Sequence, residues 1–141
     1  MSTSADGHLL LDTSAAVAIV YEDSPFHAAA ATAARGRTLG LAGHAAFEFI
    51  STVTRLPGGQ RITGAEALLV IDERFGHSRF LTPEQTAALL RELVALDILG
   101  GAVYDGLIGG AARAHGLPLL TCDRRAKPVY DALGVTYHLI S

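Results

Sequence analysis

Short apolar runs alternate with longer segments of helical periodicity along the chain. The runs are too short for helices and carry little charge, so they predict buried strands at 8–12, 38–42, 97–101, 117–121 and 135–140. Three- and four-residue spacing of apolar positions, together with cap residues, predicts helices at 13–22, 25–34, 44–55, 63–75, 82–96, 102–116 and 126–133. This order predicts an α/β domain in which helices flank a central parallel sheet in three layers.

Capping residues mark where several of these helices begin or end. Thr63 with Glu66 forms a capping box, and Thr82 with Gln85 repeats the pattern. Thr13 or Ser14 could cap the helix at 13–22, and Gly116 is suited to a left-handed helix end. Two helices at about 63–96 form an insertion between the second and third predicted strands. Because no repeat, low-complexity tract or linker interrupts the pattern, residues 1–141 are predicted to form a single domain.

Length and composition agree with one domain that has a substantial core. The chain has 141 residues, of which 50% are hydrophobic and 18% are charged. No uncharged apolar stretch reaches the roughly 18 residues that a membrane span needs. The first residues, MSTSADGH, lack the basic start and the long apolar core of a secretory signal. We therefore expect a cytoplasmic protein that does not engage membranes.

Cysteine and basic residues restrict the chemistry further. The single cysteine, Cys122, excludes an internal disulfide and a cysteine-based zinc site, and a small residue at a strand end is favoured over a reactive thiol. The net charge of −3 alone does not indicate nucleic acid binding. Ten of the eleven basic residues are arginine, which favours bidentate phosphate contacts, although GC-rich coding gives the same enrichment.

Four acidic residues lie just after predicted strands or near the start of the following helix: Asp12, Glu48, Asp105 and Asp123. In an open parallel sheet the carboxyl ends of the strands form the ligand-binding edge. Carboxylates that converge there repel one another unless a divalent cation neutralises them, and oxygen ligands suit Mg²⁺ or Mn²⁺. Each residue alone could be a helix cap or an exposed acid, but together they predict metal-dependent phosphate chemistry.

The same segments resemble the PIN domain family. The similarity is carried by LLLDTSA at the first strand, AFE in the third helix, VYDGLIGGAARAHGLPLLTCDRRA, and YDALGV near the end. More narrowly, they resemble VapC-type toxins of bacterial toxin–antitoxin pairs. The resemblance implies a magnesium-dependent endoribonuclease that is inhibited by a VapB-type antitoxin and assembles as a homodimer. Its substrate would be tRNA, rRNA or mRNA, and the sequence does not say which.

The resemblance also implies roles for the acidic residues. Asp12 and Asp105 become the principal metal ligands, and Asp123 supports a second ion or binds through water. Glu48 could orient the attacking water or accept its proton. Ser14 and Thr121, the latter matching a T-x-D signature, would hydrogen-bond the carboxylates or metal-bound water.

Several basic residues are candidates for other contacts. Arg124 and Arg125 lie beside Asp123 and could contact RNA phosphates, or one of them could pair with an acidic neighbour. Arg55 and Arg61 flank the glycine-rich turn and are weaker candidates. His44 shares a helix face with Glu48, which favours packing or capping over metal ligation because no second histidine has zinc-site spacing.

Two other function classes are compatible with the fold class. A phosphatase or phosphotransferase with an aspartyl nucleophile would want a second acid two residues after Asp12, where this chain has Ser14. It would also want a well-placed lysine, and Lys127 is the only lysine in the chain. A non-catalytic regulatory or partner-binding domain would be favoured if an acidic position were missing, and none is.

Overall fold

Four parallel strands form the centre of the molecule. The structure, a computed structural model, describes residues 7–141. The strands are β1 (His8–Leu11), β2 (Thr38–Leu41), β3 (Leu119–Thr121) and β4 (Tyr137–Leu139), in the order β2-β1-β3-β4. Leu10 in β1 pairs with Leu119 in β3. The parallel α/β sheet is therefore confirmed, whereas the N-terminal residues 1–6 used to argue against a secretory signal lie outside the described part.

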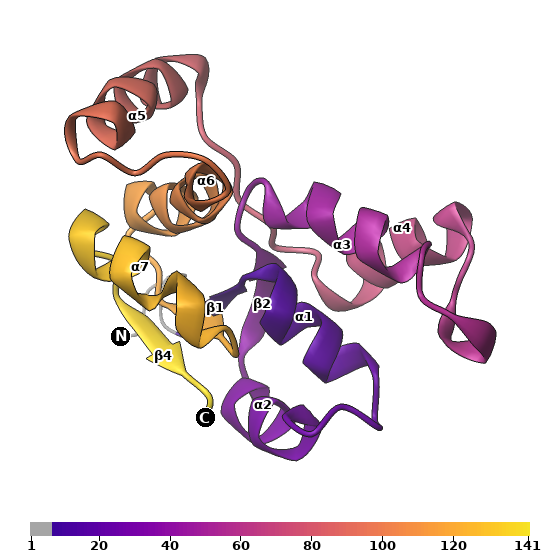
Figure 1. Cartoon of the computed structure of the whole chain (residues 1–141). Helices are drawn as coiled ribbons and strands as arrows, with labels where there is room; N and C mark the ends of the chain where they lie inside the picture. Colours follow the sequence, from indigo (N-terminus) through magenta and orange to yellow (C-terminus); the bar gives the residue numbers. More distant parts are fainter. Residues whose placement is uncertain (1–6) are drawn as a thin grey trace.

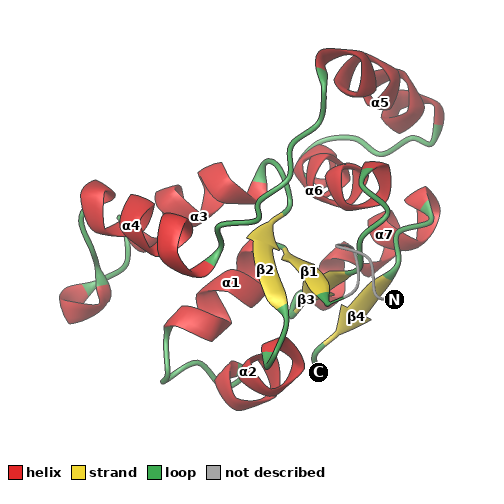
Figure 2. Cartoon of the chain, turned by 180° about the vertical axis from the view of Figure 1, so that it is seen from behind, coloured by secondary structure: helices red, strands yellow, loops and turns green. Residues whose placement is uncertain are grey.

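Seven helices flank the sheet. They are α1 (Thr13–Val20), α2 (His27–Ala34), α3 (Ala45–Val53), α4 (Gly64–Arg74), α5 (Pro83–Ala95), α6 (Ala102–Ala114) and α7 (Lys127–Leu133), with short 3-10 turns η1 (Gly58–Gln60) and η2 (Arg124–Ala126). In Figures 1 and 2, α1–α4 gather on one side of the strands and α5–α7 on the other. Within residues 7–141, no helix combines the length and apolar character needed to cross a membrane.

The capping predictions agree with the structure at three helix ends and differ at one. Thr63 and Thr82 each form a complete capping box. Gly116 has a φ of 64° just beyond α6. At α1, however, the cap is Asp12 rather than Thr13 or Ser14, because the Asp12 carboxylate accepts the hydrogen bond of Ala15 N.

The predicted strand at 97–101 is wrong. These residues instead end α5 in a Schellman turn: Asp97 has a φ of 59° and Asp97 N donates to Val94 O. Ile98 N donates to Leu93 O, and the buried Ile98 side chain completes the apolar contact typical of this turn. The apolar pair Ile98–Leu99 therefore serves a helix end, and the sheet has four strands rather than five.

A segment that no pattern predicted covers the free edge of β2. His77 N donates to Leu39 O over 3.1 Å, and Arg79 N donates to Leu41 O over 3.0 Å. Ser78 Oγ accepts a further bond from Leu41 N. Residues 76–79 thus pair with part of the β2 backbone, which would otherwise offer an open strand edge.

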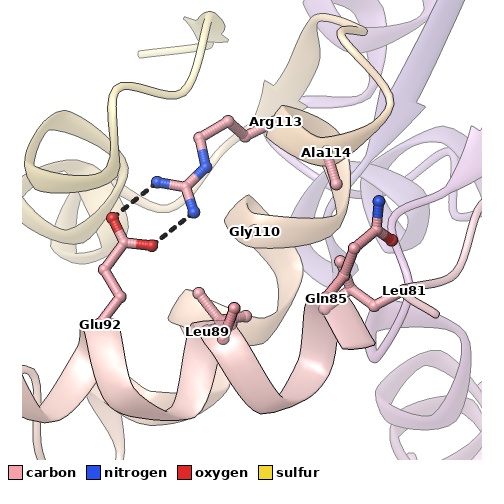
Figure 3. A pocket seen from close by; sticks show the side chains of 8 residues that line it. Leu81, Gln85, Leu89, Glu92, Gly110, Arg113 and Ala114 are labelled. Atoms are coloured by element: carbon pink, nitrogen blue, oxygen red, sulfur yellow. Dashed lines mark hydrogen bonds and ion pairs between the residues drawn. The ribbon is translucent and has the colours of Figure 1, made fainter. Parts of the chain in front are cut away.

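Helix α5 packs on α6 through glycines and one ion pair. A Cβ at Gly106 would lie 2.6 Å from Leu93, and one at Gly110 would lie 2.6 Å from Leu89, so any larger residue at either position would force the leucine side chain to move. Arg113 at the end of α6 meets Glu92 of α5 with two hydrogen bonds of 2.6 and 2.9 Å (Figure 3). The outer face of α5, including Leu90 and Val94, remains exposed.

Candidate active site

Asp12 is the most deeply buried acid of the site. It follows β1, and only 3% of its surface is exposed. Oδ1 accepts hydrogen bonds from Ser14 Oγ (2.6 Å) and Ala15 N (3.0 Å), and Oδ2 accepts one from the Tyr130 hydroxyl (3.0 Å). Burial raises the pKa of Asp12, and these hydrogen bonds oppose the rise because they stabilise the carboxylate. The fold therefore holds this carboxylate in one orientation.

Ser14 links the ends of the two central strands. Its hydroxyl donates to Asp12 and accepts from Cys122 N over 2.9 Å, so it joins the segment after β1 to the segment after β3. Thr121, fully buried at the end of β3, lies 3.5 Å from Ser14 Oγ and accepts from Asp123 N over 3.0 Å. The structure thus brings both predicted hydroxyl residues to the acidic site.

Glu48 reaches the site from α3. Its Oε1 accepts a hydrogen bond of 2.7 Å from Thr13 Oγ1, across from α1. Its Oε2 lies 3.6 Å from His44 Nε2 one turn earlier on the same helix. These two neighbours direct the carboxylate toward the start of α1, where Asp12 also lies.

Asp105, in the first turn of α6, is half-buried, and the negative charges of all three other acids act on its carboxyl group. Burial is the largest cause that raises its pKa to about 6, and the charges of Asp123, Asp12 and Glu48 raise it further. Arg125 acts in the opposite direction. The four predicted acids therefore lie close enough to repel one another, and a proton or a cation would relieve that repulsion.

Two site residues were missed by sequence reasoning. Tyr130 is fully buried and donates to Asp12, and burial together with the acidic charges raises the pKa of its hydroxyl, which keeps it a donor. Tyr130 shares the apolar face of α7 with Val129 and Leu133, so periodicity classes it as core. Thr13, expected as a possible helix cap, instead orients Glu48.

The two arginines after Asp123 are exposed. Asp123 accepts a hydrogen bond from Arg125 N, and Arg125 Nε lies 3.6 Å from the same carboxylate oxygen. The Arg125 side chain is 94% exposed, so this contact is weak. Arg124 is exposed as well. Both side chains are available at the edge of the acidic site.

The other candidate residues from the sequence lie outside the acidic site or, in the case of Cys122, are unreactive. Burial and the charge of Asp12 raise the pKa of Cys122 to about 11, so it is a neutral thiol. Asp97 lies in the turn after α5, and Asp131 pairs with Lys127 on the exposed side of α7. Arg55 is exposed and bonds to Ser51 O at the end of α3. Arg61 is exposed in the loop after η1.

The donor set suits a hard divalent cation. All four acids offer oxygen, and their mutual repulsion favours positive charge between them. Within residues 7–141, however, no three His, Cys, Asp or Glu side chains are gathered closely enough to hold an ion as they stand. Binding would therefore need water molecules or small side-chain rotations to complete the coordination, which is usual for magnesium.

Comparisons with known proteins agree with this geometry. The chain matches the PIN domain family over residues 9–132. It is 39% identical to "Ribonuclease VapC27" of Mycobacterium tuberculosis over 127 residues, which cover 90% of this chain and 93% of that protein. It is 36% identical over 114 residues to "Ribonuclease VapC40" of the same species, covering 79% and 84%.

Solved structures share the fold at low sequence identity. The VapBC2 structure from Rickettsia felis, bound to a promoter DNA fragment, matches with a TM-score of 0.64 and 16% identity over 95% of this chain and 99% of that one. VapBC-1 from nontypeable Haemophilus influenzae matches with a TM-score of 0.64 and 13% identity over 93% and 96%. From its sequence and its fold, the chain belongs to the PIN domain family.

Proposed function

We propose that the protein is a magnesium-dependent endoribonuclease that acts as the toxin of a toxin–antitoxin pair and arrests growth by cutting cellular RNA. The observation that carries the proposal is the convergence of Asp12, Glu48, Asp105 and Asp123 at one site, where burial and then the charges of the other three acids raise the pKa of Asp105. The names of the mycobacterial relatives support ribonuclease chemistry.

The surroundings of the acids suggest which of them would bind the cation. Asp12, oriented by three donors, and Asp105, which has no hydrogen-bonding partner among residues 7–141 that would lower its pKa, would be the principal ligands of a cation, with Asp123 completing the set. When bound, Mg²⁺ would supply charge neutralisation for the phosphate and a more acidic water. Manganese has the same preference for oxygen and is the expected substitute.

Glu48 is suited to handle the proton. Thr13 and His44 orient its carboxylate from two sides. We assign it to orient the attacking water and accept its proton as the new bond to phosphorus forms. Arg124 and Arg125 would contact the RNA phosphates beside the broken bond.

The geometry favours this chemistry over an aspartyl phosphatase. Such an enzyme would want a well-placed lysine beside Asp12, but Lys127, the only lysine in the sequence, is exposed and pairs with Asp131. Ser14, at the position of the second acid in such enzymes, is committed to Asp12 and Cys122.

Partners of this protein are also part of the proposal. Structures with the same fold are described as VapBC complexes, which supports a VapB-type antitoxin as the inhibitor. The exposed apolar side chains on the outer face of α5 support self-association as a homodimer. A short neighbouring reading frame that encodes a DNA-binding antitoxin would support the proposed antitoxin partner.

The test is growth after induced expression, with total RNA sequenced for new 5′ ends. Wild type should arrest growth and produce discrete ends that name the RNA target, whereas Asp105→Asn should do neither. Asp131→Asn, an exposed acid on α7 paired only with surface groups, is the matched control and should behave as wild type. Cleavage by the purified protein should stop with EDTA and return with Mg²⁺ or Mn²⁺. Arrest that persists in Asp105→Asn would contradict the assigned site.

A further inference from the structure

An exposed aromatic cluster lies at the edge of the acidic site. The ring of His44, just before α3, stacks on the ring of Tyr104 in α6, with centroids 5.2 Å apart and an interplanar angle of 23°. The centroid of the Phe47 ring, in the first turn of α3, lies 6.2 Å from the centroid of the His44 ring. We call these three residues, His44, Phe47 and Tyr104, the aromatic cluster.

The cluster is fixed to the acids by the chain itself. Tyr104 immediately precedes Asp105, and His44 Nε2 lies 3.6 Å from Glu48 Oε2. The His44–Tyr104 pair therefore connects the first turn of α3 to the first turn of α6, the two places that supply Glu48 and Asp105. An RNA whose phosphate reached Glu48 and Asp105 would therefore run close to these rings.

The cluster exposes more ring surface than packing of the two helices needs. Phe47 is 64% exposed and Tyr104 is 50% exposed, whereas the core aromatics Phe49, Phe75 and Tyr130 are fully buried. In the His44–Tyr104 stack, the exposed Tyr104 ring can offer a face on which a further flat group continues the stack, and the exposed Phe47 lies beside it. Unpaired bases in RNA loops are recognised in this way, by stacking on aromatic side chains.

We propose that the aromatic cluster is a base-stacking platform, with Tyr104 and His44 holding an unpaired base of the RNA next to the bond that is cut. This inference rests on the proposed ribonuclease function and adds a positioning role for residues outside the acidic set. Because stacking tolerates every base, the platform selects for an unstacked nucleotide in a single-stranded loop rather than for one base identity.

The experiment uses the RNA loop defined by the cleavage sites of the wild type in total RNA. It is synthesised intact and with an abasic nucleotide on either side of the cut bond, and each RNA is cut by wild type and by Tyr104→Leu. On intact RNA, Tyr104→Leu should raise KM about tenfold with a smaller change in kcat. One of the abasic RNAs should be a similarly poorer substrate for wild type, and Tyr104→Leu should cut it no worse than wild type does.

Two variants separate stacking from folding and from the hydroxyl group. Tyr104→Phe keeps the ring face and should retain wild-type KM, and Leu69→Ala, an exposed apolar side chain on α4, should also retain it. All variants should melt within a few degrees of wild type. If Tyr104→Leu melts early, Tyr104→Met with the same RNAs replaces it.

The outcomes distinguish the two proposals. If wild type cuts no RNA, the proposed function fails and the platform fails with it. If wild type cuts RNA but Tyr104→Leu has unchanged KM, or loses the same factor on the intact and on both abasic RNAs, the platform alone is overturned. Equal losses in Tyr104→Phe and Tyr104→Leu would overturn it as well, because the hydroxyl rather than the ring face would then carry the effect.

Discussion

Asp12 and Asp105 face the same acidic site but are held in opposite ways. Asp12 is buried at a helix N-terminus and accepts hydrogen bonds from Ser14, Ala15 and Tyr130. Asp105 is half-buried, and among residues 7–141 only the charge of Arg125 works to lower its pKa. Three donors orient the Asp12 carboxylate and partly offset the cost of its burial, whereas burial and three acidic neighbours both destabilise the Asp105 carboxylate. The site therefore combines Asp12, whose orientation is fixed by hydrogen bonds, with Asp105, whose ionised form a bound cation would stabilise most.

The largest expected effect is on RNA cleavage, where the two acids should behave alike. Asp12→Asn and Asp105→Asn should each lower kcat by about two orders of magnitude or more, because each removes a negative oxygen from the proposed cation site. The assay is the rate of cleavage of one RNA at saturating Mg²⁺. Asp97→Asn, in the turn after α5, is the control that should keep the wild-type rate.

Stability should separate the two acids when metal is removed. Asp12→Ala should lower the free energy of unfolding by about 1–2 kcal/mol, because the helix cap and the Tyr130 hydroxyl lose their acceptor, partly offset by the removal of a buried charge. Asp105→Ala should not destabilise the protein. Urea unfolding in EDTA measures both variants. A larger loss in Asp105→Ala than in Asp12→Ala would reverse the comparison.

Tyr130→Phe tests the orientation of Asp12 while all four acids are kept. It removes the hydroxyl that donates to Asp12 and should cost about 1 kcal/mol of unfolding free energy, together with about a tenfold loss in cleavage rate. The ring itself remains in the core, so packing is preserved. Tyr137→Phe removes a hydroxyl that bonds to Asp131 on the surface and should change neither quantity measurably.

The smallest effect concerns pH. Because the pKa of Asp105 is raised to about 6 in the folded protein, its ionisation disfavours folding in the absence of metal. The stability of wild type should therefore fall relative to Asp105→Asn as pH rises from about 4 to 6, and the difference should level off above that. After allowance for solvent screening, a gap of about 1 kcal/mol is expected at pH 7.5. A gap that does not change with pH would contradict the raised pKa.

The parts of the fold that follow local rules could be predicted from the sequence. Capping boxes at Thr63 and Thr82 and the glycine after α6 depend on residues a few positions apart, and all three were predicted. The segment at 97–101 could not be placed, since Ile98 is as apolar in a Schellman turn as in a strand. Only the position of Leu93 in space decides between them.

The same distinction holds for the site. The carboxyl ends of parallel strands and the starts of the next helices predict which acids converge. Tyr130 reaches Asp12 across 118 positions of the chain, and an apolar helix face gives no sign that its hydroxyl has a polar partner. Likewise, the stacking of His44 on Tyr104 depends on the relative placement of α3 and α6, which no periodicity encodes.

Helices α4 and α5 supply none of the four acids of the site, none of the hydroxyls that bond to them and no ring of the aromatic cluster, and α5 packs on α6 through Leu89, Leu93 and one ion pair. The residues of the acidic site and those of the outer surface on α4 and α5 therefore come from separate segments of the chain. Substitutions at the exposed positions of α4 and α5, within residues 64–95, leave the acidic site unchanged, so related proteins can differ in the partners they bind there while they keep the same four acids. A chimera that exchanges this segment between two relatives would be the natural way to test this separation.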